Sequence, residues 1–351
     1  MSTSAVPVRT ALHVRSISRW APACIGPYSQ ANVLAGGMVL LAGQIGLSPQ
    51  AMELVPGGWQ CQLDRAVRNN GRVLGALGCG RHWYCLRRRR RPLDNVLGGV
   101  IFVSADTNTA DPDAVSAAQQ CTTALLREHD THASRQQGCT GDDEVALGAD
   151  LDFGTESEGS GSDEEVQQIS PPPVPPLLVV VVPALPKGAA VEIEFAAATD
   201  VRLGSTDLLM AETASDTAVP GLGDGVNSIT YRCQAIMDTV SGFPLLAVAT
   251  VFRHFVSGTS SSVDMSALGT VVATALQFAP VSDPEADSTS RATGGCVFSQ
   301  LWVFFDATQL EEKQLRAVLE GIWVASPALS LVPVRRVSDE ALLGIYALRA
   351  P

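Results

Sequence analysis

The same order of apolar patterns occurs twice along the chain, and this repeat limits the folds that it can adopt. Short apolar runs between turn residues predict strands, and apolar residues at helical spacing predict amphipathic helices. In the first copy these patterns predict strands within 12–48 and at 95–104, 177–182 and 191–197, with helices at about 61–77 and from Asp111-Pro112 to Leu125. In the second copy they predict strands at 229–237, 245–255, 296–305, 329–334 and 342–348, with helices at 264–276 and 309–322.

The repeat indicates two domains, and the chain length agrees with that number. The chain has 351 residues, and a domain commonly holds roughly 100–200 residues. We place the first domain at 12–201 and the second at 225–351. The second copy resembles the first in the order of its elements rather than in residue identity.

The first domain is interrupted by an acidic insertion at about 127–174. Residues 142–165 hold ten Asp or Glu and no Lys or Arg, so this segment carries most of the formal net charge of −12. It holds too few apolar residues to offset the entropy lost on ordering, and we expect it to be disordered. The rest of the chain is close to neutral, and the basic run Arg87–Arg91 is expected to be a solvated insertion. Nucleic acid is therefore not an expected partner.

Membrane, metal and cofactor binding are not expected. The longest apolar run, 177–185, is interrupted by Pro183 and is shorter than the roughly 20 residues of a membrane-spanning helix. The eight cysteines form no C-x-x-C pair and follow no signal peptide. We therefore expect free thiols, no metal site, no cofactor and a cytoplasmic location.

Three segments carry a resemblance to a known family. Ile25–Ala31, Leu41–Gly46 and Leu185–Glu194 resemble, in this order, the motifs of the Rid (YjgF, L-PSP endoribonuclease-like) superfamily. The resemblance implies a chorismate-mutase-like α+β fold, in which each tandem domain has a mainly antiparallel sheet backed by two helices. It also implies trimers or pseudo-trimers with ligand clefts between the units.

The stretch from His13 to Pro22, which leads into the first motif, resembles the C-terminal region of diphthine-ammonia ligases, where two Rid-like units stand in tandem. In these ligases an N-terminal module with a Ser-Gly-Gly-Lys-Asp type loop uses ATP. The present sequence has no such loop, and its glycine pairs Gly98-Gly99 and Gly294-Gly295 lack the Lys and Ser/Thr of a phosphate cradle. The resemblance thus implies an ATP-pyrophosphatase-type ligase module as a partner.

The resemblance also implies the site residues. Tyr28 and Glu192 stand at catalytic positions, where a phenol could close the cleft and a carboxylate could position water to attack an imine. Gly43 and Gln44 stand at the ligand cleft. Deaminating relatives hold the substrate carboxylate with an Arg, and the matching position here is Leu177. Without that cation an anionic imino acid would remain unpaired.

Three functions remain open from the sequence. The first is a small-molecule-binding or regulatory module in diphthamide synthesis, which the tandem layout and Leu177 favour. The second is an enamine/imine deaminase, which Tyr28 and Glu192 favour. The third is an endoribonuclease-like protein, which no His pair supports and which the acidic insertion disfavours.

Overall fold

The structure is a computed structural model, and it describes residues 9–80, 91–106, 112–127, 174–204, 208–215, 228–254, 263–277, 298–322, 327–338 and 341–349. The predicted acidic insertion lies, apart from its first and last residues, outside the described ranges. The same holds for Gly294-Gly295 and for the basic run up to Arg90.

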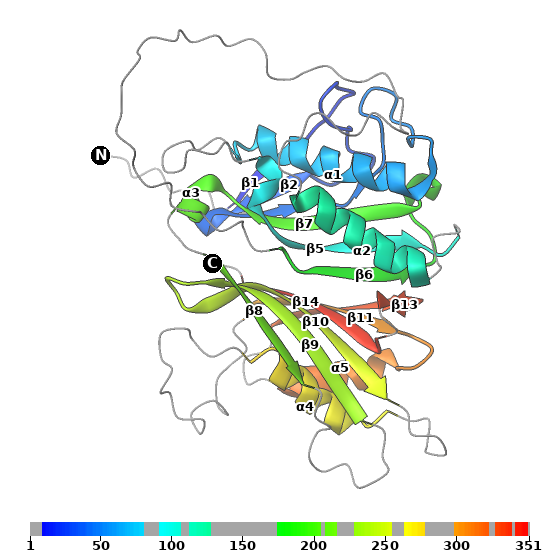
Figure 1. Ribbon diagram of the computed structural model, residues 1–351, viewed down its shortest axis with the longest axis vertical. Helices are drawn as coiled ribbons and strands as arrows, with labels where there is room; N and C mark the ends of the chain where they lie inside the picture. Colours follow the sequence, from blue (N-terminus) through cyan, green and yellow to red (C-terminus); the bar gives the residue numbers. More distant parts are fainter. Residues whose placement is uncertain are drawn as a thin grey trace, which may run out of the picture.

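The first domain is a mixed sheet with two long helices on one face (Figure 1). The strands follow the order β1-β2-β3-β7-β5-β6, β4 also pairs with β7, and every pair is antiparallel except the parallel pair β5–β6. The elements are β1 (Arg9–Leu12), β2 (Ala31–Leu34), β3 (Met38–Leu41), β4 (Gln44–Ile45), α1 (Gly58–Ala76), β5 (Val96–Ser104), α2 (Pro112–Arg127), β6 (Leu177–Val182), β7 (Val191–Ala198) and α3 (Asp200–Gly204).

Helix α1 buries the apolar stripe that the sequence predicted. Leu63, Val67 and Leu74 are at most 2% exposed and pack in the core between helices and sheet. Asn70 interrupts the apolar pattern, yet it is fully buried because its side-chain amide donates to the Ile193 carbonyl at 3.4 Å. The polar residue therefore fixes the helix to β7, since a buried amide group needs a hydrogen-bond partner.

The second domain repeats this arrangement. Its sheet order, β8-β9-β10-β14-β11-β12, matches the first sheet strand for strand, and only β11–β12 is parallel. The elements are β8 (Leu208–Ser215), β9 (Ser228–Asp238), β10 (Phe243–His254), α4 (Met265–Ala275), β11 (Gln300–Asp306), α5 (Glu312–Ile322), β12 (Ala328–Val334), β13 (Arg336–Val337) and β14 (Leu343–Leu348). The predicted α+β class with two tandem domains is confirmed; β8 lies between the two predicted domain ranges.

Asp264 begins α4 as the sequence predicted. Its Oδ1 atom accepts hydrogen bonds from the backbone N–H groups of Ser266 at 2.9 Å and Ala267 at 3.1 Å. These donors belong to the first helical turn and have no partner within the helix. The helix cap depends only on neighbouring residues, so its position could be predicted from the sequence.

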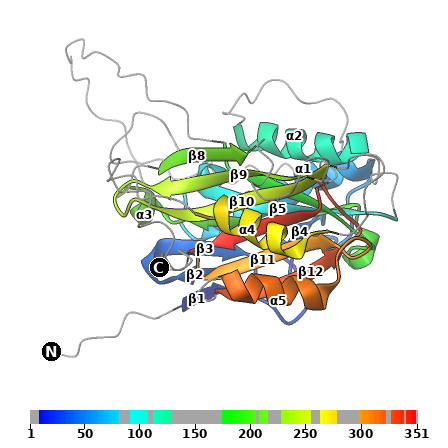
Figure 2. The ribbon, with the colours of Figure 1, turned by 90° about the horizontal axis from the view of Figure 1, so that it is seen from below.

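The two sheets pack against each other by the faces that carry no helices (Figures 1 and 2). A shared core includes Leu178 and Val180 from β6 and Leu246 and Phe304 from the second domain. A Cβ atom on Gly98 would lie 2.6 Å from Leu246 Cδ2, so the glycine permits this close approach. Strand β13 pairs with β6 and so joins the second domain to the first sheet. A separate hydrophobic core therefore lies between the two domains, in addition to the core of each domain.

Candidate functional site

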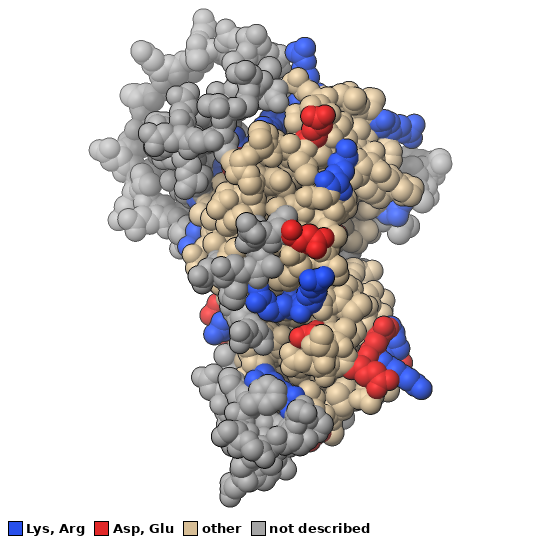
Figure 3. Space-filling view, turned by 90° about the vertical axis from the view of Figure 1, so that its right-hand side faces the viewer, with Lys and Arg blue, Asp and Glu red and all other residues tan. Residues whose placement is uncertain are grey.

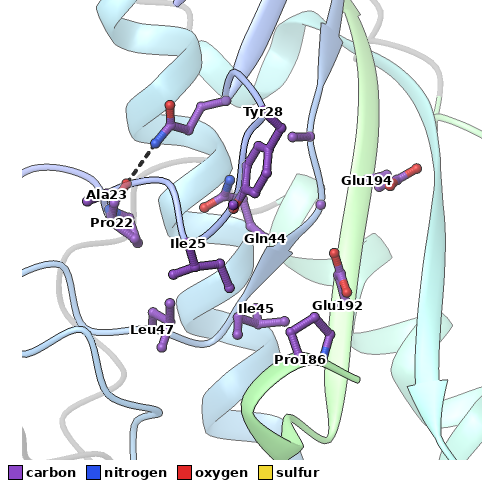
Figure 4. Close-up of a pocket in the computed structure, with 14 residues that line it drawn as sticks. Pro22, Ala23, Ile25, Tyr28, Gln44, Ile45, Leu47, Pro186, Glu192 and Glu194 are labelled. Carbon is purple, nitrogen blue, oxygen red and sulfur yellow. Dashed lines mark hydrogen bonds between the residues drawn. The ribbon is translucent and has the colours of Figure 1, made fainter. Parts of the chain in front are cut away.

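A cavity of about 460 Å³ lies on the first domain. It is bordered by residues 22–30, by 42–47, by Pro186 and by the beginning of β7 (Figure 4). These are the three segments that carry the Rid-like motifs. Their meeting places Tyr28, Gly43, Gln44 and Glu192 around one space.

Gln30 holds the loop that forms one wall of the cavity. Its Oε1 atom accepts from the Val14 backbone N–H at 2.7 Å, and its Nε2 atom donates to the Pro22 carbonyl at 2.9 Å. The backbone N–H of Ala42 donates to the Gln30 carbonyl at 2.9 Å. Since Gln30 is 1% exposed, we assign it a structural role that positions Tyr28.

Glu192 lies against Gly43 across the β4–β7 pair. A Cβ atom on Gly43 would overlap the Glu192 Oε1 atom, so the carboxyl occupies space that only a glycine leaves open. Glu192 is half-buried, and its side chain makes no hydrogen bond or ion pair with the described residues. Burial raises the pKa of Glu192, because a desolvated carboxylate is disfavoured.

Glu194 borders the same cavity, two residues further along β7. Its side chain is exposed to solvent, although many protein atoms lie around the carboxyl group. Burial, and then the charge of Glu192, raise the pKa of Glu194 to about 7. Glu194 is not among the site residues predicted from the sequence, although side chains two positions apart on a strand share one face.

Gln44 places an amide at the cavity. The residue is 5% exposed, and its side chain forms no hydrogen bond with the part of the chain that the structure describes. None of the described residues that line the cavity is basic. Lys187, next to Pro186, instead donates from Nζ to the Met52 carbonyl at 3.1 Å.

Leu177 does not line this cavity. It is 6% exposed and packs on the helix side of the first sheet, where its carbonyl accepts from Gln119 Nε2 at 3.1 Å. It borders a second cavity of about 640 Å³, to which Gln234 of the second domain also contributes. Leu177, which was expected at the ligand cleft, therefore borders a different cavity from Glu192.

The matching strand of the second domain carries no carboxyl group. Like β7, β14 is the last strand of its domain and pairs with the strand between the two helices. The β14 side chains on the face between the sheets are Tyr346 and Leu348, and Gly344 contacts Leu178 there. The carboxyl-bearing cavity is thus a feature of the first domain.

The cysteines, metal binding and membrane-spanning helices were also the subject of expectations from the sequence. Cys24, Cys79, Cys121 and Cys233 are free thiols, as predicted, but Cys61 is disulfide-bonded, which corrects that expectation for this residue. The absence of a C-x-x-C pair does not exclude a disulfide bond between cysteines at another spacing. In the described ranges, no cluster of three His, Cys, Asp or Glu suits a metal ion. In the same ranges, no helix has the length and apolarity to span a membrane.

Known proteins share parts of this sequence. Residues 18–127 match the family described as Endoribonuclease L-PSP. A diphthine-ammonia ligase of Schizosaccharomyces pombe is 43% identical over 81 residues, which are 23% of this chain and 13% of the ligase. A 2-iminobutanoate/2-iminopropanoate deaminase of Mus musculus is 48% identical over 59 residues, which are 17% of this chain and 43% of the deaminase. The chain thus spans less than half the length of either relative.

Among solved structures, TdcF from E. coli with bound serine aligns with 52% of this chain and 96% of its own length. The identity is 21% and the TM-score is 0.32.

Proposed function

We propose that the first domain, which belongs to the Rid superfamily, is a small-molecule-binding module that acts in diphthamide synthesis. The observation that carries this proposal is the cavity in which Gly43 leaves room for the unpaired carboxyl of Glu192. A concave site with a few convergent polar groups is the usual form of a small-molecule site. The similarity to a diphthine-ammonia ligase supports the assignment to diphthamide synthesis.

The proposal includes a protein partner, because the sequence has no phosphate loop with which to use ATP. We expect the chain, carrying an affinity tag, to copurify with an ATP-pyrophosphatase-type ligase module from its own cells. Mass spectrometry would identify that partner by its phosphate-loop peptide. A matched pull-down with the tag alone provides the control. If repeated pull-downs under mild conditions recover no such module, the assignment to diphthamide synthesis is wrong.

An imine deaminase is the second candidate, and the similarity to 2-iminobutanoate/2-iminopropanoate deaminases favours it. In this reading Glu192 would position the water that attacks the imine carbon. The cavity argues against this substrate, because the imino acid carboxylate would lie near Glu192 and Glu194 without a basic residue among the described lining.

We therefore expect the purified chain to leave 2-iminobutanoate, generated in situ, to hydrolyse at the uncatalysed rate. The measurement is the rate of imine loss with the parent protein and with the Glu192→Ala variant. Equal background rates would agree with a binding module. Hydrolysis by the parent that Glu192→Ala abolishes would establish the deaminase instead.

Ribonuclease activity gains no support from the face of the molecule that Figure 3 shows. Figure 3 shows one face of the molecule, on which charged side chains are sparse and uncharged residues cover most of the described area. RNA binding generally requires an extended group of Lys and Arg side chains, because phosphate contacts supply most of its affinity. We retain the binding module as the proposed function.

A further inference from the structure

We infer that the cavity of the first domain selects ligands that carry a positively charged ammonium group. This inference rests on the proposed function, because it names the chemical class of the ligand for that same cavity. It follows from the charges and hydrogen-bonding groups that line the space.

The carboxyl of Glu192 is the first of these groups. It lies against the backbone of Gly43, where no side chain can displace it, and it has no hydrogen bond or ion pair among the described residues. A carboxylate taken out of water is stable only when a cation or several donors accompany it. A ligand ammonium group would supply both a positive charge and N–H donors.

Gln44 provides a second polar group at the cavity. The residue is 5% exposed, and its amide has no partner among the described residues. On β4, Ile45 pairs with Glu192 and Gln44 pairs with Ile193, so the Gln44 side chain lies on the opposite face of the strand from the Glu192 carboxyl. Its amide can therefore bond a polar part of the ligand other than the group that meets Glu192.

Tyr28 contributes a third suitable group on the opposite wall (Figure 4). Its phenol oxygen can accept a hydrogen bond, and the face of its ring attracts cations. The apolar side chains of Ile25 and Ile45 line the cavity as well. This combination suits an alkyl chain that ends in a cation.

An anionic ligand finds no matching group. Of the described lining residues, two are acidic and none is basic, and the nearby Lys187 already donates to Met52. A ligand carboxylate would therefore face two groups of its own charge. The raised pKa values of Glu192 and Glu194 agree with this picture, because burial without a compensating cation disfavours the charged form of a carboxyl.

Three probes of nearly equal shape test the inference: n-butylammonium, butanamide and butanoate, which are positive, neutral and negative at pH 7.5. Calorimetric titration of the full chain should give affinities in that order, with n-butylammonium binding at least about tenfold more tightly than butanoate. The Glu192→Gln variant should lose most of this preference, because it removes the charge and keeps the size of the side chain. The control variant is Glu311→Gln, which removes an exposed carboxylate of the second domain and should bind like the parent.

The inference is overturned if butanoate binds as tightly as n-butylammonium, if Glu192→Gln keeps the preference, or if none of the probes binds at millimolar concentration. Preferred binding of butanoate would leave a ligand-binding module with another ligand class. The assignment to diphthamide synthesis fails separately, through the pull-down for the ligase module.

Discussion

The Leu246→Ala variant is expected to unfold with a free energy about 2–5 kcal/mol below that of the parent, the usual cost of emptying a fully buried leucine site. Leu246 is completely buried on β10, and its side chain fills the space next to Gly98 of the first domain. The substitution therefore opens a cavity between the sheets rather than within either domain. We expect both domains to lose stability together.

Urea unfolding followed by circular dichroism gives the change in free energy, and hydrogen exchange shows where it acts. Amide protons of β5 in the first domain and of β14 in the second should both exchange faster in the variant. The control is Leu209→Ala on β8, where the side chain is 52% exposed, so its effect should stay within about 0.5 kcal/mol. Faster exchange in the second domain alone would show that the domains are stabilised independently.

Much of the fold could be predicted from the sequence because its signals are local. The apolar spacing of Leu63, Val67 and Leu74 places α1, and the side-chain chemistry of Asp264 places the start of α4. Both features depend on residues within about three helical turns of each other. The repeated order of elements then indicates the second domain even without residue identity.

The packing of the domains could not be predicted, because it depends on contacts between distant residues. Gly98 and Gly99 lie inside β5, within the predicted strand 95–104. Gly98 faces Leu246 and Gly99 lies against Phe195, so each glycine serves a different close contact. The pairing of β13 with β6 likewise joins segments more than a hundred residues apart.

The site was predicted in part. The resemblance assigned Tyr28, Gly43, Gln44 and Glu192 to one site, and in the structure these four residues line one cavity. The match to the family motif assigned Leu177 to the ligand cleft from its position along the chain. A position along the chain does not show which cavity a side chain borders. The side chains of Leu177, Val179 and Val181 all lie on the helix side of the first sheet. This orientation, which only the structure shows, places Leu177 at a different cavity from Glu192.

Gly43→Ala is expected to have the largest effect on the cavity with little effect on the fold. The new Cβ atom would take the position of the Glu192 Oε1 atom, which is the far end of a flexible side chain. Glu192 can rotate away at modest cost, so the protein should remain folded while the carboxyl leaves the ligand site. We expect at least about a tenfold loss of affinity for n-butylammonium, equal to about 1.4 kcal/mol.

Gly321→Ala is the matched control, because it makes the same chemical change in α5 where no atom lies within 4 Å of the added Cβ. An alanine in a helix is favoured over a glycine, so this variant should be at least as stable as the parent. It should bind the probe like the parent.

The most direct measurement follows the methyl NMR signals of the isoleucines while n-butylammonium is added to the parent and to both glycine variants. In the parent and in Gly321→Ala, the signals of Ile25 and Ile45, which line the cavity, should shift to saturation, while Ile345 on β14 stays unchanged. In Gly43→Ala the shifts of Ile25 and Ile45 should require far more ligand. Shifts confined to the second domain, or equal binding by Gly43→Ala, would contradict a ligand site built around Gly43 and Glu192.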